Sequence, residues 1–208
     1  MKKLFITIAF VAASMLASAQ LYVGGSLGMD FSKSKDKFES TTVEGDKVVA
    51  FDITPSVGFM FADNMGAGID FGFGITNTTT PANDPEPEIK TKESAWAVAP
   101  YFRYVFAEVD NFKFYADAKL GLGGGKSKQT ADGTTVEGPK VTYLGVGIVP
   151  GMAYMLTDNI SMNCTLNVLA LSFEQTKQKL DDWSSTETAI GFGINRATPV
   201  TIGFFYNF

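Results

Sequence analysis

The chain has 208 residues, a formal net charge of −5 at pH 7, no histidine and one cysteine. An acidic chain disfavours nucleic acid as a partner, because phosphate binding needs clustered Lys and Arg. One cysteine excludes an intramolecular disulfide, and the 21 Gly and 18 Phe residues together are unlike both a disordered chain and a helical bundle.

The first 19 residues have the three parts of a secretory signal peptide. Lys2 and Lys3 form a basic start, residues 4–16 form an apolar run, and an Ala-Ser-Ala cleavage site follows. The apolar run is too short to cross about 30 Å of hydrocarbon as a helix. We therefore expect a leader over residues 1–19 and one domain over residues 20–208.

Period-two alternation dominates the rest of the chain. In residues 65–77, for example, Phe71 and Phe73 alternate with Asp70 and Gly72. This period predicts strands with one large apolar face and one small or polar face. The expected strands are residues 20–32, 48–62, 65–77, 94–107, 112–124, 140–156, 160–173 and 188–208.

Asp-Asn pairs recur at intervals of 47 and 48 residues, and each follows a proline by eight to ten residues. Asp and Asn suit tight turns because their side chains bond nearby backbone and tolerate left-handed conformations. With a further proline nine residues before the last residue, the chain contains four repeats of a hairpin unit. The turn pairs are Asp63-Asn64, Asp110-Asn111 and Asp158-Asn159.

The small face of these strands favours a membrane barrel over a soluble barrel or sandwich. Gly, Ser and Asp facing water along whole strands would weaken them, whereas inside a narrow barrel they leave room for large polar side chains. Aromatic residues also gather near both ends of the strands, as in the girdles of an outer-membrane barrel. No apolar run after residue 20 has the length of a membrane helix, so a spanning chain must close as a barrel. The large interior residues would be Tyr22, Tyr101, Tyr115 and Arg103.

The connections alternate in length. Those at 62–65, 107–112 and 157–159 are short, and four others are long and polar. This asymmetry predicts an all-β, eight-stranded antiparallel up-and-down transmembrane β-barrel with short periplasmic turns and long extracellular loops. The expected loops are residues 33–47, 78–93, 126–139 and 174–187.

The last strand is irregular. Residues 195–199 interrupt its alternation, and we expect a bulge there because proline cannot donate to a strand ladder. Arg196 would then face lipid. Ten strands instead of eight remain an alternative.

Charged residues on the interior face suggest two roles. Asp70, Arg103, Asp117 and Lys119 lie at similar heights on adjacent expected strands, so they are expected to form an ion network that plugs the barrel. Asp30 and Asp52 share the same parity. Because acids outnumber bases in this set, the alternative is the lining of a narrow, cation-preferring channel.

No residue pattern indicates catalysis, a cofactor or a metal. Without histidine, a serine lacks its usual activating base. Ser-Lys and carboxylate mechanisms stay open, but no residue pattern indicates one.

The segment 121–127 is similar to a phosphate-binding loop but has Leu120 where the motif opens and no helix after it. Loop acids lack the spacing of a calcium site, and Cys164 has the lipid-facing parity of a small apolar residue. We expect a protein that is not an enzyme.

The final residues 201–208 resemble the C-terminal assembly signal of outer-membrane β-barrels: polar, any, Gly, two of any, aromatic, any, aromatic. Thr201, Gly203, Tyr206 and Phe208 fill its defined positions. Together with the leader and the repeats, this pattern makes the chain similar to small outer-membrane barrels of the OmpA/OmpX kind, in the outer-membrane protein β-barrel family.

The resemblance implies a location in the outer membrane of a Gram-negative cell, with membrane lipid and the barrel-assembly machinery as partners. It implies no single function. We expect a non-enzymatic barrel that presents charged loops to extracellular ligands, with the narrow cation channel as the alternative. A third role, as an accessory of assembly or secretion, has no discriminating residue.

Overall fold

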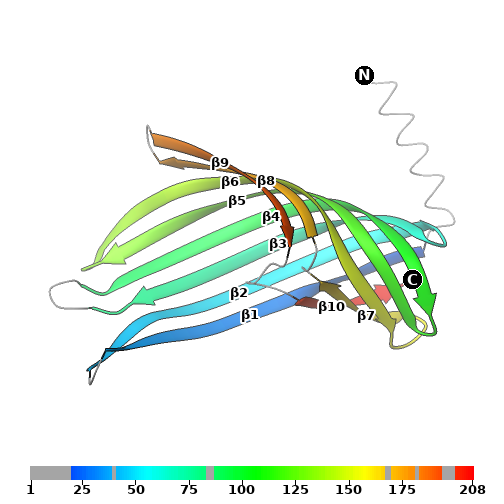
Figure 1. The fold of residues 1–208 in the computed structure, drawn as a ribbon, viewed down its shortest axis with the longest axis horizontal. Helices are drawn as coiled ribbons and strands as arrows, with labels where there is room; N and C mark the ends of the chain where they lie inside the picture. Colours follow the sequence, from blue (N-terminus) through cyan, green and yellow to red (C-terminus); the bar gives the residue numbers. More distant parts are fainter. Residues whose placement is uncertain (1–19, 39–40, 83–86, 167–169, 181–182, 194–199) are drawn as a thin grey trace.

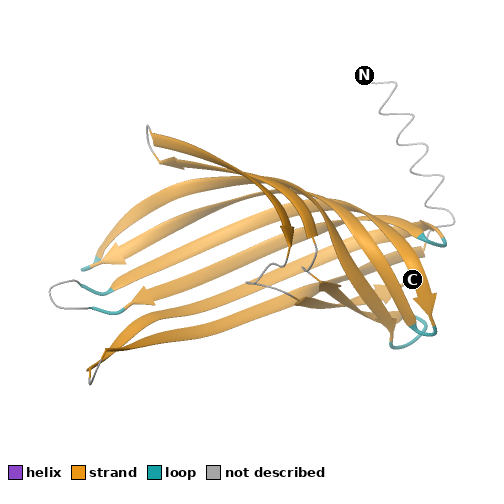
Figure 2. Cartoon of the chain, in the orientation of Figure 1, coloured by secondary structure: helices purple, strands orange, loops and turns teal. Residues whose placement is uncertain are grey.

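The computed structural model describes residues 20–38, 41–82, 87–166, 170–180, 183–193 and 200–208. All the regular elements in this part of the chain are β-strands (Figures 1 and 2). No helix among the described residues is long and apolar enough to cross a membrane. The expected leader, residues 1–19, lies outside the described residues.

Ten strand segments are described, and the first six are long and each pairs antiparallel with the next. They are β1 (Gln20–Phe38), β2 (Thr41–Ala62), β3 (Met65–Thr80), β4 (Ile89–Val109), β5 (Phe112–Ala131), β6 (Thr134–Met155), β7 (Ile160–Leu166), β8 (Ala170–Leu180), β9 (Trp183–Gly193) and β10 (Val200–Asn207).

These ten segments occupy eight strand positions. β7 pairs with residues 151–155 of β6 and β8 pairs with residues 140–148, so β7 and β8 are successive parts of one strand position. In the same way β9 pairs with β8, and β10 pairs with β7 and β1. The result is a closed antiparallel eight-stranded barrel, which confirms the predicted architecture. The bulge expected at 195–199 and the orientation of Arg196 lie outside the described residues.

The barrel closes through a short seam between β1 and β10 (Figure 1). The two strands pair only over residues 22–26 of β1, and within the described residues the outer part of β1 pairs with β2 alone. The two strands approach each other closely at a glycine of this seam, since a Cβ on Gly203 would lie only 2.6 Å from the carbonyl oxygen of Gly25. A larger residue at position 203 would therefore push the two strands apart.

The tight turns lie where the Asp-Asn pairs predict them. Asp63-Asn64 joins β2 to β3, and Asp110-Asn111 joins β4 to β5. Asp110 has a positive φ of 51°, a conformation that Asp and Asn tolerate better than most residues. Asp158-Asn159 lies in the connection from β6 to β7, so all three expected turns are present.

The barrel has a polar interior and an apolar exterior. Exposed large apolar side chains lie on the outward face of every long strand, and the buried side chains on the inward face include many polar ones. This arrangement is the reverse of a soluble core and is what strands surrounded by lipid require. The buried inward residues are Tyr22, Ser56, Tyr101, Arg103, Val105, Tyr115, Asp117, Ala153, Ser161 and Asn163.

Three of the four polar segments predicted as long loops, 33–47, 126–139 and 174–187, are mostly strand, and 78–93 is strand at both ends, which corrects the predicted bounds. β5 and β6, for example, run to a two-residue turn at Asp132-Gly133, where both residues have positive φ, 49° and 74°. Backbone ladders pair the extended hairpins, and exposed ion pairs lie along them: Lys33 Nζ lies 2.8 Å from Glu44 Oε1 and Lys128 Nζ lies 3.2 Å from Glu137 Oε1. Alternation did not reveal these strands because both of their faces are polar.

Candidate functional site

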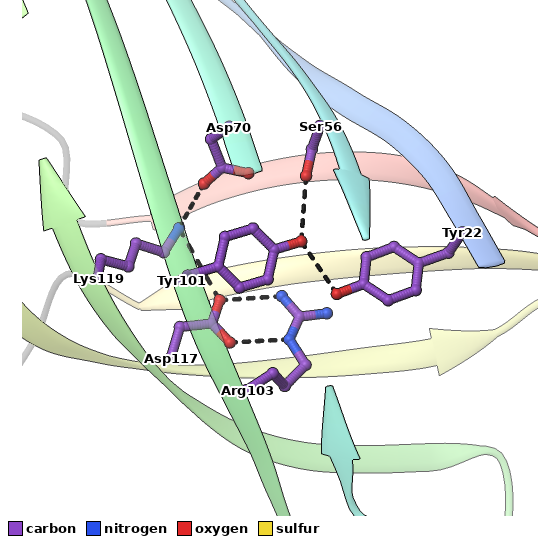
Figure 3. Close-up of polar contacts among 7 residues, drawn as sticks. All are labelled: Tyr22, Ser56, Asp70, Tyr101, Arg103, Asp117 and Lys119. Atoms are coloured by element: carbon purple, nitrogen blue, oxygen red, sulfur yellow. Dashed lines mark hydrogen bonds and ion pairs between the residues drawn. The ribbon is translucent and has the colours of Figure 1, made fainter. Parts of the chain in front are cut away.

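The interior charges meet at the middle of the barrel, on three neighbouring strands. In the register of β4 and β5, Arg103 lies opposite Asp117 and Tyr101 lies opposite Lys119. Asp70 projects from β3 toward the same place, and Figure 3 shows these side chains converging inside the barrel. The alternation of each strand puts all of them on the inward face.

Arg103 and Asp117 form a two-pronged ion pair. The Nε atom of Arg103 donates to Asp117 Oδ1 over 2.8 Å, and its Nη2 atom donates to Oδ2 over 2.9 Å. Asp117 has no solvent exposure and Arg103 is 9% exposed. Parallel charge-assisted bonds of this kind are short and fix the geometry of both groups.

Lys119 extends the pair into a chain of four charges. Its Nζ atom lies 2.8 Å from Asp70 Oδ2 and 3.8 Å from Asp117 Oδ2. Two cations and two carboxylates thus alternate in space, so the buried charges of the cluster compensate one another.

Tyrosines surround the guanidinium of Arg103. Its Cζ atom lies 3.8 Å from the ring centroid of Tyr115 and 5.4 Å from that of Tyr101, within the range of cation–π attraction. The hydroxyl of Tyr101 is 3.0 Å from the hydroxyl of Tyr22 and 3.2 Å from Ser56 Oγ. Hydroxyl hydrogen bonds therefore join β1, β2 and β4, and ion pairs join β3, β4 and β5. Ring contacts of Arg103 bring the two groups together as one polar layer inside the barrel (Figure 3).

This interior layer, defined as Tyr22, Ser56, Asp70, Tyr101, Arg103, Tyr115, Asp117 and Lys119, lies between two cavities. One cavity of about 250 Å³ is lined by Asp70, Lys119 and Thr201 among others, and a second of about 300 Å³ is lined by Met155 and Asn207 among others. Four residues line both cavities and so stand between them. They are Arg103, Tyr115, Asn163 and Phe205.

Two of the six predicted interior charges are not in this layer. Asp30 and Asp52 share its inward parity, but they lie nearer the long hairpins, opposite Ala50 and Gly28. Both are exposed, and no ion pair joins either of them to another described residue. Asp30 and Asp52 lie on the same inward face as the charges of the interior layer, but at a different height along their strands.

Three residues of this region were not predicted from the sequence. Ser56 and Asn163 are buried and polar, and Phe205 packs edge-on against Tyr22 with ring centroids 6.0 Å apart. Ser56 and Asn163 share the inward parity of their strands, so a search of that parity for polar residues would have found them. Phe205 gave no such signal, because it resembles its lipid-facing neighbours.

The charged groups of the layer are engaged with one another. Each carboxylate of the layer is already paired with Lys119 or Arg103. In the described part of the chain, no three His, Cys, Asp or Glu side chains are arranged to hold a metal ion.

The residues of the expected assembly signal divide between the two faces of β10. Thr201 and Gly203 line the first cavity, while Tyr206 and Phe208 are exposed outside with ring centroids 4.8 Å apart. The N–H of Phe208 donates to the carbonyl of Leu21 over 2.8 Å. This backbone hydrogen bond joins the end of the chain, after β10, to β1.

Comparisons with known proteins agree with this architecture. The family model of the outer membrane protein beta-barrel domain matches residues 4–207. An uncharacterized protein of Haemophilus influenzae is 26% identical over 167 residues, which is 80% of this chain and 88% of that protein.

Two solved structures are also similar. A major outer membrane protein from Thermus thermophilus has 12% identity and a TM-score of 0.52, over 92% of this chain and 100% of that one. The outer membrane protein OprG from Pseudomonas aeruginosa has 15% identity and a TM-score of 0.48, over 91% and 95% of the two chains. The likeness to the Thermus protein shows a shared fold.

Proposed function

Since the chain belongs to the outer membrane protein β-barrel domain family, whose members lie in the outer membrane, we propose that it is a non-enzymatic surface barrel. In this proposal residues 1–19 are removed as a leader, the barrel-assembly machinery inserts the remainder, and the long hairpins face the exterior. Their function is to contact extracellular ligands.

The length of the strands is the observation that carries this proposal. β2 and β6 have 22 residues each, whereas a tilted strand needs about 9–11 to cross a bilayer. The remaining residues extend the sheet beyond the membrane on the side opposite the short turns. These extensions are rich in charged and Thr residues that suit contact with water and polar ligands.

Exposed apolar residues near two hairpin tips supply anchors for a ligand. Trp183 begins β9 and is 53% exposed, and Val136 lies near the start of β6 and is 61% exposed. A large aromatic side chain surrounded by polar groups is the common composition of a binding hot spot. We therefore place the strongest contact at the β8–β9 hairpin.

Adhesion of cells that display the protein tests this proposal. Shortening the β8–β9 hairpin by residues 177–186 should weaken attachment to wells coated with mucin or with a sulfated polysaccharide. A variant that loses residues 35–44 of the β1–β2 hairpin, also ten residues, measures the cost of shortening a hairpin that carries neither anchor. Attachment that survives both deletions unchanged would contradict the proposal.

A narrow cation-preferring channel is the second candidate. The exposed Asp30 and Asp52 on the inward face, which have no ion-pair partner among the described residues, favour it, because carboxylates at a mouth attract cations. The interior layer weighs against it, since Arg103 and Tyr115 stand between the two cavities. An eight-stranded barrel has an interior that side chains fill.

Conductance in planar bilayers separates the two candidates. The surface-barrel proposal expects no conductance from the wild type at any salt concentration, and conductance from an Arg103→Ser/Tyr115→Ser variant in which the cavities join. Steady cation-selective currents from the wild type would favour the channel.

A further inference from the structure

Three lysines form a row across the outer wall of the barrel. In the strand register, Lys126 of β5 lies opposite Lys140 of β6, and Lys140 lies opposite Lys179 of β8. All three side chains are exposed. Neighbouring strands are about 4.8 Å apart, so the three residues stand side by side; we call them the lysine row.

The lysine row faces away from the lumen. On β5, the interior residues Asp117 and Lys119 have odd numbers, while Lys126 shares the even parity of the exposed Leu120 and Leu122. The pairing of β5 with β6 stays in one register up to Lys126, so this parity holds. Residues paired across a sheet share a face, which places Lys140 and Lys179 outside as well.

The lysine row lies just beyond the apolar band. From Phe112 to Leu122 the outward face of β5 is apolar, and at about 3.3 Å per residue and a tilt near 40° this stretch spans roughly 25 Å. That is the height of the lipid-facing band of an outer-membrane barrel. Lys126, four positions after Leu122, falls where lipid headgroups begin.

An aromatic belt residue marks the same level. Trp96 of β4 pairs with Gly124 and is 51% exposed. Its Nε1 atom lies 3.2 Å from where a Cβ of Gly124 would be, so the indole covers the glycine. Trp at this depth is typical of the interface between hydrocarbon and headgroups.

The lysine row is electrostatically unfavourable by itself. Like charges directly opposite each other on adjacent strands destabilise a sheet, and no ion pair joins these three lysines to a carboxylate among the described residues. Three other lysines of the hairpins are paired with glutamates. Lys33, Lys90 and Lys128 lie within 2.8, 2.9 and 3.2 Å of Glu44, Glu88 and Glu137.

A groove adjoins the row on the outer wall. It has a volume of about 640 Å³, and Lys126 and Lys140 contribute to its lining together with Trp96 and Leu122. Gly124 lies in its floor, beside the indole of Trp96. A groove with an apolar floor and a cationic rim suits an amphiphile that has acyl chains and an anionic headgroup.

We propose that the lysine row binds the phosphate groups of a phosphorylated glycolipid of the outer leaflet, of the lipid A type. The three ammonium groups neutralise the phosphates, and the groove receives the sugar and the adjoining acyl carbons. Binding would relieve the repulsion within the row. This inference uses the placement in the outer membrane and does not depend on what the hairpin tips bind.

The test measures lipid bound to purified barrel in detergent by native mass spectrometry. The probes are bisphosphorylated lipid A, the same lipid without its phosphates, and inorganic pyrophosphate as a soluble competitor. We expect the wild type to bind the bisphosphorylated form at least tenfold more tightly than the dephosphorylated form. Pyrophosphate should compete weakly, because it lacks the acyl chains that occupy the groove.

Three variants identify the residues responsible. Lys126→Gln/Lys140→Gln/Lys179→Gln should lose the tenfold preference, and replacement of the same residues by Arg should keep it. The control Lys33→Gln/Lys90→Gln/Lys113→Gln removes as many charges, but from lysines already paired with glutamates, and should bind as the wild type does. Circular dichroism verifies that each variant is folded.

Three outcomes would overturn the proposal. The first is equal binding of lipid A with and without phosphate. The second is an equal loss of binding in the control variant, which would indicate a general charge effect. The third is complete displacement by pyrophosphate, which would indicate a site for soluble anions.

Discussion

Arg103 and Asp117 face each other across the β4–β5 ladder and are joined by two hydrogen bonds of 2.8 and 2.9 Å inside the barrel. Among the described residues neither side chain has another ionic partner at a comparable distance, because Lys119 is 3.8 Å from Asp117 and 2.8 Å from Asp70. The pair therefore fixes the positions of these two side chains, and so the part of the interior layer that β4 and β5 contribute.

Removing the charge of Asp117 should strongly destabilise the barrel. Asp117→Asn preserves the side-chain volume but leaves a buried guanidinium without its counter-ion, a change that costs about 3–5 kcal/mol. Urea unfolding in phospholipid vesicles, followed by tryptophan fluorescence, measures the loss. Glu137→Gln is the control: it breaks the exposed pair with Lys128 and should cost less than about 1 kcal/mol. Similar losses in both variants would contradict the role given to burial.

The seam between β1 and β10 should be sensitive to the size of residue 203. Gly203→Ala places a methyl group 2.6 Å from the carbonyl oxygen of Gly25, and relief of that contact should cost about 1–3 kcal/mol. Gly72→Ala is the control, because the added methyl would meet its nearest neighbour, Ala97, at 3.5 Å, an ordinary contact. Equal stability of the two variants in urea would show that the seam can widen freely.

Phe208→Ala should lower the amount of barrel in the outer membrane more than it lowers the stability of barrel already folded. Phe208 is 66% exposed, and its backbone hydrogen bond to Leu21 does not need the ring. Quantifying folded protein in outer-membrane fractions, together with urea unfolding, separates the two effects. Phe204→Ala removes another exposed ring from β10; if it reduces the yield as much, the effect does not belong to the assembly signal.

The hairpin pair Lys33–Glu44 should weaken in acid. The hydrogen bond from the Lys33 ammonium holds the pKa of the Glu44 carboxyl below its ordinary value. A carboxyl with a lower pKa in the folded state stabilises that state above its unfolded pKa, and the contribution disappears as pH falls through the folded pKa. The carboxyl ¹³C shift of Glu44 reports this titration. Lys33→Gln should raise the pKa, whereas Lys90→Gln should leave the titration unchanged.

Much of the barrel could be predicted because a bilayer imposes a simple pattern. Alternation predicts the inward face, so it places Arg103 and Asp117 on the same side of the sheet. The Asp-Asn pairs set the turns, since the conformations of Asp and Asn suit a reversal within two residues.

The features that the sequence does not predict lie where this alternation of apolar and polar residues ends. Beyond the membrane both faces of a strand are polar, so the hairpin around Asp132-Gly133 looked like a loop. Asp30 and Asp52 have the inward parity, but only the strand register shows how far they are from Asp70. The lysine row was also hidden, because Lys126, Lys140 and Lys179 become neighbours only through pairing of distant segments.

In the proposed orientation the extended hairpins, whose strands are paired in the sheet, change the thermodynamics of binding an extracellular ligand. A flexible loop loses backbone conformational entropy when a ligand fixes it, at about 1–2 kcal/mol per residue. A paired hairpin has already lost most of that freedom during folding. A ligand that binds these hairpins therefore meets a preorganised surface. Substitutions at exposed residues near the hairpin tips, such as Val136, can change which ligand is bound without destabilising the barrel.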